Sequence, residues 1–273
     1  MWSKFALLIG GVAIGAIAGQ FAVPRVGLPG PGYRQENAAA PRVERPCAAA
    51  SARTAIIVVH GQSNAGNHGT VRYHAREAVD NFDPLTGKCF AAIDPLLGAD
   101  GVGGSFATRL GDILIQAGRY DRVVLVPIAL GGASISLLNG EHSYRITNVI
   151  LKLRAANLTP THILFQQGER DAMLPTTQEE YVKQLRGLVE RFRTAGFSAP
   201  FYVSQSTRCD MEVQKNTAAV RAGQLSAVDD LLNIRRGPDT DLIGNGGRNP
   251  DDGCHMNEIG TLANAALWAA YIE

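Results

Sequence analysis

The stretch AIIVVHGQSNAG, residues 55–66, opens the part of the chain that we expect to fold. Its first five residues are apolar and mostly β-branched, which is typical of a strand buried on both faces of a parallel sheet. The strand should end at Gly61, and Ser63 follows among glycine, glutamine and asparagine. A serine in such a turn is usually structural, so the rest of the chain decides whether Ser63 is a nucleophile.

Apolar strands and amphipathic helices alternate along the chain after this stretch. The helix expected over 177–195 has the clearest signals, because Thr177 and Glu180 fit a capping box and apolar residues recur at helical spacing. This alternation predicts one α/β domain, a three-layer α/β/α sandwich around a central parallel sheet with right-handed crossovers. Further strands are expected over 123–130, 162–166 and 201–204, and further helices over 105–118, 144–156 and 259–272.

The bulk composition is that of an ordinary globular protein. The chain has 273 residues, which is compatible with one large domain plus extensions. It has 26 Lys and Arg against 25 Asp and Glu, with no local basic cluster, so we expect no nucleic-acid partner. The sequence leaves the oligomeric state open.

The N-terminal region differs from the rest in composition. Residues 5–23 carry no charge, so they form either a signal segment or a helix long enough to span a bilayer, and we favour an uncleaved anchor. We assign 1–23 to this segment and 24–54, rich in Pro, Ala and Gly, to a linker. The folded domain would then span 55–273. This organisation predicts an exported, extracytoplasmic or periplasmic protein whose membrane contact is limited to the N-terminal segment.

Export would place the four cysteines in an oxidising compartment, where cysteines usually pair. Four cysteines allow three pairings. We expect Cys47 with Cys89 and Cys209 with Cys254, because each pair would tie a loop near the first strand or near the last motif. Cys254 is also an alternative nucleophile beside His255, but the even number of cysteines favours the disulfide.

Polar and glycine residues follow each predicted strand, and ligands of parallel sheets bind at the carboxyl ends of the strands. Ser63 follows the first strand in this way. A hydrolytic serine needs a base and an acid that orients the base. The motif DDGCHMN, residues 251–257, places Asp252 three residues before His255, a separation that one turn can close. We therefore expect Ser63 as nucleophile, His255 as general base and Asp252 as its orienting acid.

Acyl transfer also needs hydrogen-bond donors aimed at the developing oxyanion. The candidates are the backbone N–H of Ser63, the N–H of Gly131 or Gly132 after the second strand, and the side-chain amide of Gln167 after the third. Each signal is weak alone, and their joint placement at one sheet edge carries the prediction.

Four blocks carry a resemblance to a known family: GQSNAG from residue 61, ALGGAS from 129, QQGERDA from 166 and DDGCHMN from 251. The sequence resembles the SGNH (GDSL-type) hydrolase superfamily and, within it, the sialate O-acetylesterase-like group, carbohydrate esterase family 6. The resemblance implies a flavodoxin-like sandwich and ester hydrolysis without metal or cofactor. It implies the same triad, with the oxyanion held by Ser63, Gly131 in preference to Gly132, and Gln167 in place of the superfamily's asparagine.

The third block also contains Glu169 and Asp171. We interpret them as a hydrogen-bonded brace between the loops of the first and third strands, since buried polar networks commonly fix a site's geometry. The rival interpretation is that one of them orients His255 instead of Asp252. Gln62 and Asn64 are expected to bind backbone groups and shape the serine turn.

The segment 67–104 is rich in turn formers and lacks periodicity, so we expect a substrate-facing insertion without regular structure. Its aromatic residues either stack on a sugar or form a small local core. The histidines other than His255 receive structural or loop roles, and none has the spacing of a zinc site. The aromatic residues in question are Tyr73, Phe82 and Phe90, and the histidines are His60, His68, His74, His142 and His162.

These residues predict a serine esterase that removes short acyl groups, with acetyl implied by the family, from a carbohydrate through an acyl-enzyme on Ser63. An acyltransferase with the same triad and a sugar hydroxyl as acceptor is the nearest alternative. A carbohydrate-binding envelope protein that has lost activity is another, and the presence of Ser63, Asp252, His255 and Gln167 counts against it.

Overall fold

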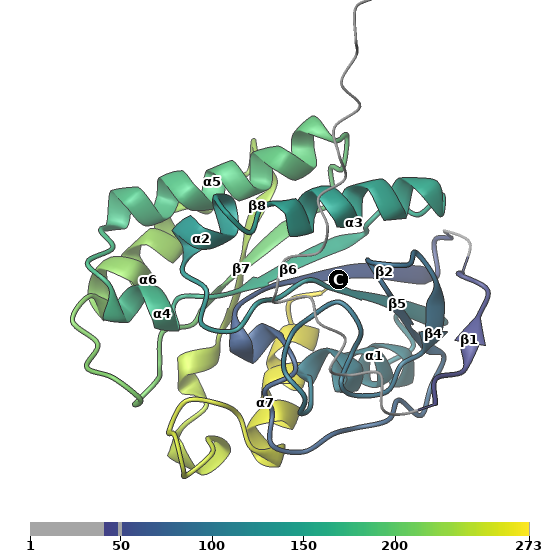
Figure 1. Ribbon diagram of the computed structural model, residues 1–273, viewed down its shortest axis with the longest axis horizontal. Helices are drawn as coiled ribbons and strands as arrows, with labels where there is room; N and C mark the ends of the chain where they lie inside the picture. Colours follow the sequence, from purple (N-terminus) through teal and green to yellow (C-terminus); the bar gives the residue numbers. More distant parts are fainter. Residues whose placement is uncertain (1–40, 49–50, 273) are drawn as a thin grey trace, which may run out of the picture.

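The computed structural model describes residues 41–48 and 51–272. The described chain forms one eight-stranded sheet in the order β1-β4-β3-β5-β2-β6-β7-β8 (Figure 1). Neighbours among β3, β5, β2, β6, β7 and β8 pair in parallel, whereas β4 and β1 add an antiparallel edge. The strands are β1 (Glu44–Arg45), β2 (Thr54–Gly61), β3 (Val79–Phe82), β4 (Cys89–Ala91), β5 (Arg122–Pro127), β6 (His162–Gln166), β7 (Phe201–Gln205) and β8 (Ile234–Asp239).

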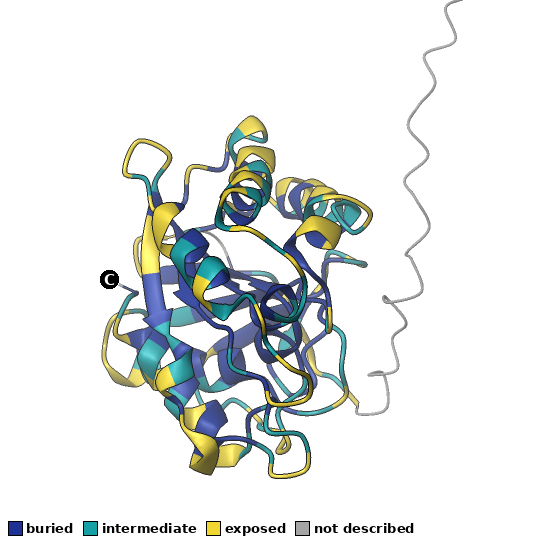
Figure 2. Ribbon diagram, turned by 90° about the vertical axis from the view of Figure 1, so that its left-hand side faces the viewer, coloured by how far each residue is buried: buried dark blue, intermediate teal, exposed yellow. Residues whose placement is uncertain are grey.

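Helices cover both faces of the sheet, as the predicted sandwich requires. Alternate residues of β2 point to opposite faces, so Ile56 and Val58 pack under one helical layer and Ile57 and Val59 under the other. The first layer contains α2, α3, α5 and α6, and the second contains α1 and α7 (Figures 1 and 2). The helices are α1 (Phe106–Gln116), α2 (Ile135–Asn139), α3 (Tyr144–Ala155), α4 (Glu169–Met173), α5 (Gln178–Thr194), α6 (Thr217–Ser226) and α7 (Glu258–Ala269).

Strand β2 lies where the strand order reverses, because the chain forms β3, β4 and β5 on one side of β2 and then crosses to β6 on the other side. It is buried along its whole length, as its apolar run predicts. In a doubly wound sheet the crevice at such a switch point, beyond the carboxyl ends of the strands, is the usual ligand site. The predicted fold and the predicted position of the serine turn are therefore confirmed.

The elements with an apolar pattern have nearly the predicted bounds. Thr177 caps α5 by accepting a hydrogen bond from the Glu180 N–H at 3.2 Å. The prediction for 67–104 is wrong in one respect, because the segment contains β3 and β4. Strand β3 has the sequence V-D-N-F, which lacks the apolar alternation of a strand. Its Asp80 is nevertheless buried, because it pairs with Arg122.

The structure describes part of the predicted linker but none of the predicted anchor. The described part of 24–54 belongs to the folded domain, because β1 pairs with β4 and Thr54 begins β2. The segment 1–23 lies outside the described residues. Among those that are described, no helix is long and apolar enough to cross a bilayer.

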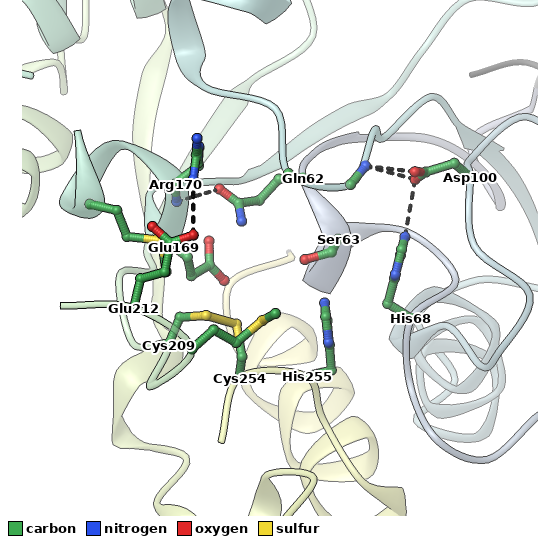
Figure 3. A pocket seen from close by; sticks show the side chains of 14 residues that line it. Gln62, Ser63, His68, Asp100, Glu169, Arg170, Cys209, Glu212, Cys254 and His255 are labelled. Carbon is green, nitrogen blue, oxygen red and sulfur yellow. Dashed lines mark hydrogen bonds and ion pairs between the residues drawn. A yellow bond between two sulfur atoms is a disulfide. The ribbon is translucent and has the colours of Figure 1, made fainter. Parts of the chain in front are cut away.

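Both expected disulfides are present. Cys47 is bonded to Cys89, which fastens the chain before β2 to β4. Cys209 is bonded to Cys254, which joins the loop after β7 to the loop before α7. The Cys209–Cys254 bridge lies near Ser63 and His255 in Figure 3.

Buried polar side chains order the long segment between β2 and α1. Asn67 binds the backbone of Leu96 and Ala99, and Asp94 accepts from the Tyr73 and Ser105 N–H groups and from Thr108. Phe82 is fully buried, which favours a core role for this aromatic residue over sugar stacking. Burial raises the pKa of Asp94 to about 6, although its hydrogen bonds act in the opposite direction.

The raised pKa of Asp94 gives a stability prediction. The unfolded carboxyl has a pKa near 3.8, so between about pH 4 and 6 the folded state holds a proton that the unfolded state releases. This contribution to the free energy of unfolding is present at low pH and is lost as the pH rises, by about 3 kcal/mol at most. We expect Asp94→Asn to gain stability relative to the wild type between pH 4 and pH 7 in urea unfolding. An unchanged stability difference at the two pH values would contradict the assignment.

Candidate active site

A pocket of about 290 Å³ lies at the carboxyl edge of the sheet, and Ser63 lines it. Ser63 is the first residue of a single 3-10 turn, Ser63–Ala65, directly after β2. The chain can turn there because Gly61 has φ +139°, and a Cβ at this position would lie 1.9 Å from the carbonyl oxygen of Gln166. The N–H of Ser63 has no partner inside the turn, since the first N–H groups of a helix have none.

The predicted acid and base are in contact. His255 Nδ1 lies 2.8 Å from Asp252 Oδ2, and the other carboxylate oxygen accepts from the N–H groups of Cys254 and His255. Partial burial acts to raise the pKa of Asp252, but these N–H groups and the His255 ring together lower it below its usual value. The carboxylate therefore stays ionised at neutral pH and fixes the ring with Nε2 free.

Ser63 and His255 both line the pocket, and their side chains lie next to each other in Figure 3. No direct hydrogen bond joins them in the described structure. Catalytic hydrogen bonds of this kind often shorten only when substrate is bound. The serine turn after β2 and the loop before α7 thus bring the predicted nucleophile and base to one space.

Asn64 connects the serine turn to two other loops. Its amide donates to Glu169 Oε1 at 2.8 Å and to the carbonyl of Cys254 at 3.3 Å. The same Glu169 oxygen accepts from Ser206 after β7. Burial raises the pKa of Glu169, which the Asn64 hydrogen bond partly offsets. Glu169 is placed as a brace between the loops of β2, β6 and β7, and it makes no hydrogen bond to His255.

Gln62 supports the same turn from the other side. Its side-chain oxygen accepts from the N–H groups of Gly168 and Arg170 at the start of α4, at 3.3 and 3.1 Å. Gln62 thus gives these two N–H groups an acceptor, and leaving them buried without one would be costly. Gln62 and Asn64 are thus placed as the sequence predicts.

Gln167 does not reach the pocket. Its side chain is fully buried, and its amide nitrogen donates to Asp171, Gln62 and the carbonyl of Ala133. Burial raises the pKa of Asp171, whose carboxylate also accepts from the Ile135 N–H. The structure therefore does not bring the Gln167 amide to the oxyanion position expected for it.

Gly131 lines the pocket, but its N–H already donates to both oxygens of Asp100, at 2.8 and 2.9 Å. Gly132 also lines the pocket and has φ +66°, and its N–H makes no hydrogen bond within the described part of the chain. Of the two glycines, the structure leaves Gly132 as the available donor.

Several residues that line the pocket carry no sequence motif that predicts a role in the site. His68 and Asp100 line it on the side of Gly131, and His68 Nε2 lies 3.3 Å from Asp100 Oδ1 (Figure 3). The position of His68, five residues after Ser63, is the one signal that points to it. On the opposite side the pocket is lined by Arg170, Met173, Met211, Glu212 and the Cys209–Cys254 bridge.

The remaining histidines are placed away from the site. His60 is fully buried in β2, where burial lowers its pKa to about 3. His162 lies at the start of β6, at the opposite edge of the sheet. Within the described residues, no group of three or more His, Cys, Asp or Glu side chains could hold a metal ion.

The sequence pattern of the family described as "Carbohydrate esterase, sialic acid-specific acetylesterase" matches residues 53–259, which include the pocket and all four blocks. The chain belongs to this family. It is an ester hydrolase of the carbohydrate acetylesterase class. A comparison of the sequence with curated proteins gives no significant match.

Solved structures share the fold of this esterase at low sequence identity. A protein from Arabidopsis thaliana is 15% identical with a TM-score of 0.63, and the match covers 81% of this chain and 98% of that one. A lipase/acylhydrolase from Enterococcus faecalis is 13% identical with a TM-score of 0.50, covering 81% and 95%. A carbohydrate acetylesterase from Xanthomonas citri is 15% identical with a TM-score of 0.50, covering 79% and 55%. These likenesses show that the fold is shared.

The two disulfides provide a matched test of how the His255 loop is held. They close loops of similar length, with sequence separations of 42 and 45, so each should stabilise the fold by about 3 to 4 kcal/mol. Replacing Cys209 and Cys254 with Ser should lower kcat for an acetyl ester as well as stability, because His255 follows Cys254. Replacing Cys47 and Cys89 should lower stability alone. Equal kcat in the two double variants would contradict a role for the second bridge in the site.

Proposed function

We propose that this esterase removes O-acetyl groups from a carbohydrate through an acyl-enzyme on Ser63. The observation that carries the proposal is the contact of Asp252 with His255 at 2.8 Å, in the same pocket as a serine at the carboxyl end of the central strand. The alternative orienting acids, Glu169 and Asp171, bind other partners. The family match supports removal of acetyl groups.

In the proposed mechanism, His255 Nε2 takes the proton of the Ser63 hydroxyl as its oxygen attacks the ester carbonyl. Asp252 holds Nδ1 and stabilises the imidazolium that forms. The proton then passes from His255 to the sugar oxygen as its bond to the acyl carbon breaks, so the sugar leaves as an alcohol and the acyl group remains on Ser63. Water gives a proton to His255 and attacks the acyl-enzyme, and His255 then returns this proton to the Ser63 oxygen as the acyl–oxygen bond breaks, which releases the acid and the free serine.

The oxyanion would be held by the main-chain N–H groups of Ser63 and Gly132. Both residues line the pocket, and neither N–H has an acceptor in the described structure. Gly131 and Gln167, the donors expected from the sequence, have their N–H groups bound to Asp100 and to Asp171, Gln62 and Ala133. In this proposal Gln167 supports the two loops that carry the donors, because its amide binds Gln62 next to Ser63 and the carbonyl of Ala133 next to Gly132.

The pocket volume of about 290 Å³ is at the lower end of the range for small-molecule sites, which suits a single sugar residue with its acyl group. The two disulfides favour an exported protein, because such bonds persist in oxidising compartments. We therefore propose an extracytoplasmic enzyme that acts on acetylated sugars outside the cytosol.

Single substitutions test the triad. Ser63→Ala and His255→Ala should abolish hydrolysis of a chromogenic acetate ester. Asp252→Asn should lower kcat by about 10²- to 10⁴-fold, because a neutral amide does not stabilise the positive charge of the His255 imidazolium. Activity of Ser63→Ala near that of the wild type would refute the nucleophile assignment. Adding an acceptor alcohol and measuring the transfer product separates a hydrolase from an acyltransferase.

A further inference from the structure

We propose that His68, held by Asp100, is a positioning residue that supports the ring of His255 from its face during catalysis. The proposal rests on the proposed function, since it assumes that His255 is the base of Ser63. No step of the proposed mechanism uses His68, and Asp100 enters it only as the acceptor of the Gly131 N–H.

The two imidazole rings are stacked. The ring centroids of His68 and His255 are 5.2 Å apart and the planes are inclined by 20°. This separation is within the range in which aromatic rings interact favourably. Asp252 restrains His255 only through the ring edge that carries Nδ1. Rotation about that hydrogen bond would still move Nε2 away from Ser63, and a ring against its face removes this freedom.

His68 is itself held on two sides. Asp100 accepts from Nε2 at 3.3 Å and is in turn fixed by the Gly131 N–H. A Cβ on Gly101 would lie 2.7 Å from His68 Cδ2, so the backbone packs closely against the ring. Because the carboxylate oxygen can only accept, the hydrogen bond places a proton on Nε2 of His68. The ring plane of His68 is therefore fixed by contacts that do not involve His255.

Two substitutions separate the ring from the hydrogen bond. His68→Phe keeps a flat ring against His255 and loses the bond to Asp100, whereas His68→Gln keeps an amide for Asp100 and loses the ring. Since small displacements of catalytic groups cost up to about 10²-fold, we expect His68→Gln to lower kcat by roughly 10- to 100-fold with KM unchanged. His68→Phe should restore most of kcat. His74→Ala, an exposed histidine of the same segment outside the pocket, is the control.

A second readout distinguishes positioning from sugar binding. The rate of Ser63 phosphonylation by a small alkyl phosphonate measures activation of the nucleophile without a sugar. We expect this rate to fall with kcat in His68→Gln and to recover in His68→Phe, with equal thermal unfolding midpoints in both. A change confined to KM, an unchanged phosphonylation rate, or a loss as large in His68→Phe as in His68→Gln would overturn the proposal. A wild-type protein that neither hydrolyses the ester nor labels at Ser63 would refute the proposed function itself.

Discussion

The site depends on the close approach of two backbones at the carboxyl ends of β2 and β6. Gly61 lies against the carbonyl of Gln166, and the Cβ of any other residue at this position would lie 1.9 Å from that carbonyl oxygen. The N–H of Gln62 then donates to the same carbonyl, so the chain leaves β2 already attached to β6. This attachment sets the start of the turn that presents Ser63.

Buried polar side chains extend this arrangement to the other loops. Asn64 reaches both Glu169 and the carbonyl of Cys254, and Arg248 donates to that same carbonyl at 2.7 Å. The serine turn, the α4 loop and the histidine loop therefore share hydrogen bonds, and the Cys209–Cys254 bridge adds a covalent tie. Shared buried hydrogen bonds of this kind restrict the loops to one relative arrangement, since breaking one of them would leave a buried polar group without its partner.

The sequence predicts what depends on local pattern. The apolar runs of β2 and β6 and the capped helix α5 follow from periodicity, and Asp252 meets His255 because three residues close within one turn. Strand β3 escapes prediction, because its Asp80 is buried by pairing with Arg122 from β5. The Gln167 amide donates to Gln62 and to the carbonyl of Ala133, which are 105 and 34 residues away, and His68 pairs with Asp100, which is 32 residues away. These contacts join distant segments, so no local pattern reveals them.

The central claim is that Ser63 carries the acyl group during turnover. The most direct measurement is mass spectrometry of the wild-type protein quenched with acid during hydrolysis of an acetyl ester, followed by peptide mapping. We predict one acetyl group on the peptide that contains Ser63, absent when Ser63→Ala is treated in the same way. An acetyl group on another residue, or the same adduct in Ser63→Ala, would contradict the account.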